Sequence, residues 1–191
     1  MKTPLRFQVT EYDCGTISLL NAFSYLFERE TIPVELVRAI HLYTLDCADE
    51  NGVVGGKGTS KEAIKKLTRW ITHFTTEKDF NVKCELLIGD DVTLDKITNC
   101  INNGGCILFR CKQDVDHYVI GTKITKKHIY IFDPYYLDKK YYNNDKQVKI
   151  VFNKPFTHNR VVTLKRLFGE SKQDFSLGLK DNRECLLINK K

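Results

Sequence analysis

The segment DCGTISLLNAFSYLF, residues 13–27, is the clearest structural signal in the first part of the chain. Apolar side chains from Cys14 to Phe27 leave few polar positions, which predicts a helix buried on most sides. Asp13 directly precedes this helix and is a residue type that favours the N-cap position. Cys14 would lie in the first turn, where the helix dipole and unpaired N–H groups stabilise a thiolate. Gly15 would leave space for a substrate carbonyl to approach that thiol.

Two further helices are predicted downstream of this segment. Pro33 favours the first turn of a helix that runs to about Leu42. Thr59 and Glu62 have the spacing of a capping box, which predicts the start of a third helix. Between these two helices lies an irregular, glycine-rich loop, residues 46–58, which we expect to line a cleft.

The second half of the chain has mainly the pattern of β-strands. Strands are predicted at 82–88, 106–111, 118–124, 128–132, 147–152 and 185–188, and a short helix at 93–102 ends at Asn103-Gly104-Gly105. Helices followed by strands predict an α+β fold. We expect one domain over residues 1–191, with a helical half at about 1–80 and an antiparallel sheet half at about 81–191. A cleft between the halves is the expected place for a site.

Composition excludes several classes of protein. The net charge is +6, but Lys and Arg are interspersed along the chain, which does not indicate nucleic-acid binding. None of the seven cysteines forms a C-x-x-C pair, which favours free thiols in a reducing cytosol. No apolar run is long enough to span a membrane, and the first residues lack a secretory signal. We therefore expect a cytoplasmic protein without a membrane span. We expect no cofactor, because the glycine-rich loop lacks the Lys-Ser/Thr pair of a phosphate loop. We expect no metal, because Cys106 and Cys111 would point to opposite faces of one strand and make a poor zinc site.

Three other residues have the positions that a cysteine nucleophile requires. His117 stands in QDVDHYVIG, where a polar loop becomes a strand, so its imidazole can project into a cleft as the base. Asp133 follows the next predicted strand, and a hairpin would bring its carboxylate beside His117. Gln8 lies shortly before Cys14, where its amide can donate to an oxyanion. The alternatives are a thiol packed under the helix start and an ordinary surface glutamine. The other cysteines have core positions, except Cys47 in the polar loop.

Several segments together resemble a known bacterial family. QVTEYDCG (residues 8–15), DHYVIG (116–121) and FDP (132–134) are similar to segments of the papain-like peptidases that process bacteriocins by cutting after a double-glycine leader. GTSKEAIKKL (58–67) and INNGGCILF (101–109) extend the resemblance over most of residues 5–135. The resemblance implies a papain-like cysteine peptidase fold in a free-standing relative without transporter domains. Residues 136–191 have no counterpart in it.

The resemblance also implies the roles of the site residues. Cys14 would be the nucleophile, His117 the base, Asp133 the acid that orients the base and Gln8 the oxyanion donor. The expected function is cleavage of a peptide or amide bond. One alternative is an acyltransferase that moves an acyl group from a carrier thioester to an amine, and a basic surface would suit an acidic carrier protein. A non-catalytic binding module is the second alternative, and the intact set of four residues argues against it. The substrate preference and the oligomeric state stay open.

Overall fold

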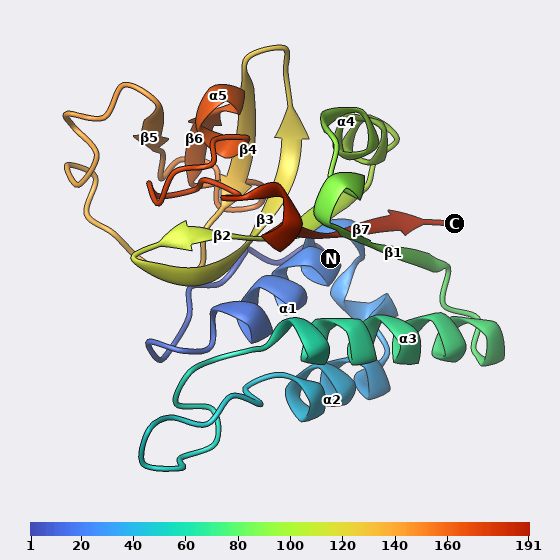
Figure 1. Cartoon of the computed structure of the whole chain (residues 1–191). Coiled ribbons are helices and arrows are strands. Elements are labelled where there is room, and N and C mark those ends of the chain that lie inside the picture. The colour runs from blue at the N-terminus through green and yellow to red at the C-terminus, as the bar shows by residue number, and fades with distance from the viewer.

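The seven β-strands of the protein form one antiparallel sheet, and helices cover both of its faces (Figure 1). The computed structural model describes residues 1–191. The α-helices are α1 (Cys14–Leu26), α2 (Val34–Tyr43), α3 (Lys61–Glu77), α4 (Leu94–Asn102) and α5 (Leu164–Leu167). The strands are β1 (Val82–Ile88), β2 (Cys106–Gln113), β3 (Val115–Ile124), β4 (His128–Phe132), β5 (Val148–Ile150), β6 (Arg160–Thr163) and β7 (Glu184–Lys190). The predicted α+β class is confirmed.

The order of strands across the sheet is β1-β7-β2-β3-β4-β6-β5. The last strand of the chain, β7, therefore lies between β1 and β2 and pairs with both of them. The hairpin of β3 and β4 is present as predicted, with Ile120 opposite Phe132. β3 begins earlier than predicted, at Val115, so His117 lies inside the strand and not before it.

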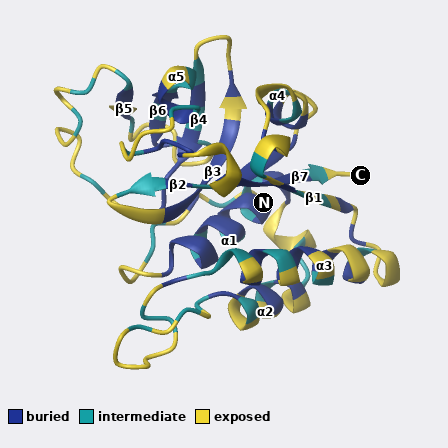
Figure 2. Ribbon diagram, viewed as in Figure 1, coloured by how far each residue is buried: buried dark blue, intermediate teal, exposed yellow.

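Successive residues of the strands point to opposite faces of the sheet and supply two separate cores. On one face, Tyr118 and Ile120 of β3 pack in the same core as Leu19 and Phe23 of α1. On the other face, Val119 packs in a core that includes residues of α4 and α5. Most of α1 is buried, as the apolar run predicts, and Figure 2 shows the dark, buried ribbon of α1 under the sheet. No helix of the structure is long and apolar enough to cross a membrane.

The starts of two helices differ in detail from the prediction. Asp13 occupies the N-cap position of α1, as predicted, but its carboxylate makes no bond to the helix and instead accepts hydrogen bonds from the backbone N–H groups of Val9 (3.1 Å) and Thr10 (2.9 Å). Asp13 therefore fastens the segment before α1. The N-cap of α3 is Ser60, whose Oγ accepts from the N–H of Ala63 at 3.0 Å. The capping box predicted at Thr59 was wrong by one residue, because two adjacent residues both have capping side chains.

The C-terminal third of the chain contains one strand that the sequence pattern did not predict. β6, Arg160–Thr163, lies between β4 and β5 and follows the polar segment His158-Asn159. The strand predicted over 147–152 is shorter, and β5 contains only Val148–Ile150. Short strands give weak periodic signals, which is why the pattern misses or overextends them.

Candidate active site

Cys14 lies at the start of α1, where a helix stabilises negative charge. It is 8% exposed and lines a cleft of about 720 Å³. His117 of β3 lines the same cleft. Other walls come from the segment before α1 and from the loop between α2 and α3, most of which is at least partly exposed (Figure 2). The thiol and the imidazole thus face one space that a substrate can enter.

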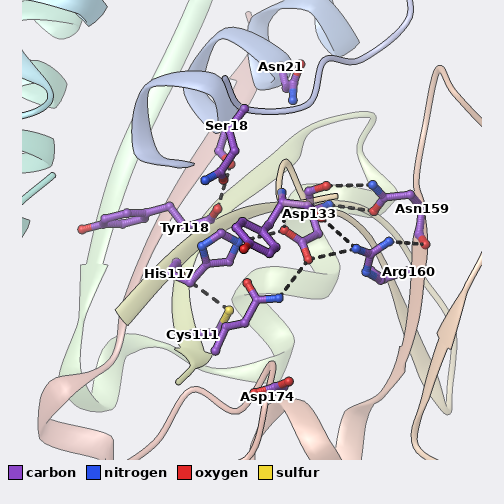
Figure 3. A network of polar contacts seen from close by, with 12 residues as sticks. Ser18, Asn21, Cys111, His117, Tyr118, Asp133, Asn159, Arg160 and Asp174 are labelled. Atoms are coloured by element: carbon purple, nitrogen blue, oxygen red, sulfur yellow. Dashed lines mark hydrogen bonds and ion pairs between the residues drawn. The ribbon is translucent and has the colours of Figure 1, made fainter. Parts of the chain in front are cut away.

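The imidazole of His117 is held by the carboxylate of Asp133. His117 Nε2 lies 2.8 Å from Asp133 Oδ1, and Figure 3 shows the two side chains pointing toward one another. Asp133 directly follows β4, so the hairpin brings the two residues to the same end of the β3–β4 pair, as the sequence predicts. With Nε2 engaged by the carboxylate, Nδ1 is the ring nitrogen left to exchange a proton with another group.

A buried serine joins the helix of the cysteine to the strand of the histidine. Ser18 Oγ, one turn after Cys14 in α1, donates to the carbonyl oxygen of Tyr118 at 2.9 Å (Figure 3). Tyr118 directly follows His117 in β3. This bond therefore fixes α1 against β3 close to both site residues.

Electrostatic effects favour the charged forms of His117 and Asp133. Burial alone would lower the pKa of His117, but the Asp133 carboxylate and, to a smaller extent, the charge and hydrogen bond of Cys14 raise it to about 10. Burial would likewise raise the pKa of Asp133, but His117 and then Arg160 outweigh it and hold that pKa below its ordinary value. At neutral pH the pair is therefore an imidazolium next to a carboxylate.

Asp133 is surrounded by donors from the C-terminal third of the chain and from neighbouring strands (Figure 3). Arg160 Nη2 lies 3.3 Å from Asp133 Oδ2, and both side chains are fully buried. Gln113 Nε2 donates to the same oxygen at 3.4 Å, and the backbone N–H of Tyr135 donates to Oδ1 at 2.8 Å. The side-chain amide of Asn159 bonds both the N–H and the carbonyl of Asp133, at 2.8 and 2.7 Å. The carboxylate is thus held in one orientation.

Sequence reasoning did not identify Asn159, Arg160 or Gln113 as part of this site. Asn159 and Arg160 lie in residues 136–191, where no resemblance guided the search. The polar pair Asn159-Arg160 directly before the apolar residues of β6 is the one signal in that region. Arg160 is the first residue of β6, and a fully buried charged residue indicates an ionic partner.

The structure places Gln8 beside the turn that contains Asp133, but holds its side chain within its own segment. The backbone N–H of Gln8 donates to the carbonyl of Pro134 at 2.9 Å, which joins the segment before α1 to that turn. Gln8 Nε2 donates to the carbonyl of Thr10 at 2.7 Å, and Gln8 Oε1 is buried without a partner. An amide nitrogen carries two N–H groups, so one of them is not used by Thr10.

Close packing explains why residue 15 is a glycine, and this explanation differs from the predicted one. A Cβ at this position would lie 2.7 Å from Thr59 Oγ1, so the space next to Gly15 is already filled by Thr59. Glycine there allows α1 to approach the segment that precedes α3. The prediction that Gly15 leaves space for a substrate carbonyl was wrong.

Cys14, His117 and Asp133 come together in the structure, and their catalytic roles, with that of Gln8, stay predictions. A scan against protein-family models and a search of curated proteins both find no match to this sequence. No group of three or more His, Cys, Asp or Glu side chains is arranged to hold a metal ion.

Proposed function

We propose that this protein is a cysteine peptidase-like enzyme with a papain-like arrangement, which cleaves a peptide or amide bond. The observation that carries the proposal is the pairing of His117 with the buried Asp133 in the wall of the cleft that Cys14 also lines. A thiol at a helix start, a histidine beside it and a carboxylate that orients the histidine are the parts that a thiol nucleophile requires. The resemblance of the three short segments around these residues points in the same direction.

The proposed reaction has two halves: Cys14 is first acylated by the substrate, and water then hydrolyses the thioester. The Cys14 sulfur attacks the carbonyl carbon, and the oxyanion that forms is stabilised by the N–H of Cys14 and the amide of Gln8. As the carbon–nitrogen bond breaks, the imidazolium of His117 gives its Nδ1 proton to the leaving amine. Water then attacks the thioester while His117 takes a proton from it, and the acid product leaves as Cys14 is restored.

The test of this proposal is the appearance of new peptide ends that depend on Cys14. The wild-type protein and a Cys14→Ser variant are incubated with a pool of peptides from a proteome digest, and the products are identified by mass spectrometry. We expect new carboxyl ends with the wild type alone. If glycinamide is added and most products carry it in place of a free carboxylate, transfer to an amine outcompetes hydrolysis, which favours the acyltransferase. Identical products from the wild type and the variant would support the binding module and contradict the enzyme.

Alkylation of Cys14 is expected to be faster than that of the other six cysteines, and this selectivity should persist at pH 6. His117 keeps its positive charge below its raised pKa of about 10, and a cationic neighbour activates a thiol toward alkylation. An ordinary thiol with a pKa of about 8.5 is mostly un-ionised at pH 6 and reacts slowly there. The measurement is limited iodoacetamide labelling followed by mass spectrometry of the seven cysteine peptides.

Cys47 is the internal control, because it lines the same cleft but lacks a cationic partner. Burial and the neighbouring Asp46 raise the pKa of the Cys47 thiol. Labelling of Cys47 should therefore be slow at pH 6 and increase with pH. Equal labelling of Cys14 and Cys47 at pH 6 would mean that the Cys14 thiol is not activated.

Replacing Gln8 with alanine is expected to lower kcat by about 10²–10³-fold with little change in KM, the usual effect of losing one oxyanion donor. The assay uses a peptide found in the digest experiment. Gln173→Ala removes an exposed glutamine far along the chain and should leave both constants unchanged. If KM rises in Gln8→Ala while kcat stays the same, Gln8 binds substrate and is not an oxyanion donor.

A further inference from the structure

Three cationic side chains gather where α3 begins beside β2. Lys61 is the first residue of α3, and Arg110 and Lys112 lie on β2. Lys61 and Arg110 line the cleft that contains Cys14 and His117. Together with Lys112 they also line an adjoining cavity of about 590 Å³. The two hollows share Lys61, Arg110 and Asp116, so these two cations and one carboxylate lie where the hollows adjoin.

These cations have fewer negative partners than they could bind. Asp116 accepts from both Arg110 Nη1 at 2.7 Å and Lys112 Nζ at 2.5 Å. Lys61 Nζ donates to the carbonyl oxygen of Asn182 at 2.9 Å, and Arg110 Nη2 donates to the same oxygen at 3.2 Å. A carbonyl oxygen carries no full charge. Three cations thus share one exposed carboxylate.

Other carboxylates near the cluster do not neutralise it. Glu184 is buried, accepts from the hydroxyl of Tyr118 at 2.9 Å and forms no ion pair with any of the three cations. Glu170 and Lys172 also line the adjoining cavity, and their charges offset each other. The cavity therefore retains an excess of positive charge.

The effect of this crowding is seen at Lys61. Burial lowers the pKa of Lys61 first, and the positive charges of Arg110 and Lys112 lower it further, while Glu184 and Asp116 act in the opposite direction. An incoming anion would reduce the repulsion among the three cations. Asp116 is the acidic residue of the Cys14 cleft that pairs with these cations, and the other acidic residues, among them Glu11 and Asp49, lie before α1 and on the loop between α2 and α3. At α3 and β2 the cations therefore outnumber the carboxylate that pairs with them.

We propose that Lys61, Arg110 and Lys112 form a specificity subsite that binds a carboxylate side chain of the peptide substrate near the bond that Cys14 attacks. The subsite rests on the proposed function, because it presumes that a substrate extends from Cys14 along this cleft. The recognised group is an aspartate or glutamate side chain. Two or three donors on rigid elements suit the two oxygens of a carboxylate.

Two alkylating reagents of equal size test the subsite without a known substrate. Bromoacetyl-glutamic acid α-amide and bromoacetyl-glutamine α-amide differ only in one negative charge, and both alkylate a thiol. At pH 7 and low salt, we expect the acidic reagent to modify Cys14 about fivefold faster than the neutral one, as two partly exposed ion pairs would provide. The preference should weaken as salt is added. In a Lys61→Gln/Lys112→Gln variant it should fall to about one.

Lys65→Gln/Lys66→Gln is the matched control, because it also removes two positive charges, from positions of α3 outside both hollows. It should keep the fivefold preference. If Cys14 is alkylated selectively but both reagents react at the same rate, the subsite is wrong and the proposed function stands. If the double variant keeps the preference for the acidic reagent, another charged residue causes that preference, and the subsite is also wrong. If neither reagent selects Cys14 over Cys47, both proposals fail.

Discussion

Replacing His117 with alanine is expected to lower turnover by about 10²–10⁴-fold, the range for loss of a general acid–base group. The same change should slow the alkylation of Cys14 at pH 6 by up to about 10²-fold, because an ordinary thiol is mostly un-ionised there. The reason is structural. His117 is buried, its pKa is raised to about 10 by the Asp133 carboxylate, and its Nε2 lies 2.8 Å from Asp133 Oδ1.

The fold should survive this substitution. Without His117, the Asp133 carboxylate keeps its contacts with Arg160, Gln113 and the backbone of Tyr135. Thermal unfolding of the variant checks this point, and His41→Ala on the exposed face of α2 is the control for histidine loss in general. Full activity of His117→Ala in a folded protein would remove His117 from the mechanism and with it the proposed enzyme.

Replacing Arg160 with methionine is expected to lower the free energy of unfolding by about 3–5 kcal/mol, the usual cost of leaving one member of a buried ion pair without its partner. Arg160 and Asp133 are both fully buried, so water cannot replace the lost guanidinium. Arg160 also donates to the carbonyls of Tyr135 and Asn159, at 2.9 and 3.1 Å. The measurement is urea unfolding at pH 7. The loss of stability is read from the shift of the midpoint urea concentration, provided that the dependence of the unfolding free energy on urea concentration is unchanged.

A matched variant and a double variant separate the ion pair from other effects. Arg166→Met also removes a buried guanidinium, but its partner Asp145 is 25% exposed, so the loss should be smaller. Adding Asp133→Asn to Arg160→Met removes both charges, and the double variant should be more stable than the sum of the single losses predicts, by about 1–3 kcal/mol. Additive losses would mean that Arg160 stabilises the protein through packing and not through Asp133.

Much of the region that carries the site follows from local patterns in the sequence. The apolar run after Asp13 specifies α1, and the two β-rich runs on either side of residues 125–127 specify the β3–β4 hairpin, so Cys14 and the contact of His117 with Asp133 were both accessible to prediction. These features depend on residues close together in the chain. The position of Cys14 at the start of a helix follows from the same run.

The parts that the sequence did not reveal depend on distant residues. Arg160 and Asn159 reach Asp133 from a short strand whose partners lie elsewhere in the chain, and no periodicity indicates such a contact. Thr59 and Ser60 are both capping residues, and only their surroundings decide that Ser60 caps α3 while Thr59 packs against Gly15. The proposed cationic subsite was not predictable from the sequence for the same reason, since α3 and β2 meet only in the folded protein.

The position of β7 has a consequence for the order in which the molecule is assembled during synthesis. β1 has only β7 as a neighbour in the sheet, so β1 stays unpaired on the ribosome until the chain has been made as far as Lys190. Such pairing between distant segments is slow, because loop-closure entropy is lost before the contacts form. Until then β1 and β2 each present an open edge to other nascent chains. Glu184, which accepts from the hydroxyl of Tyr118 next to His117, arrives with the same strand, so this part of the cleft wall forms only after β7 has been made.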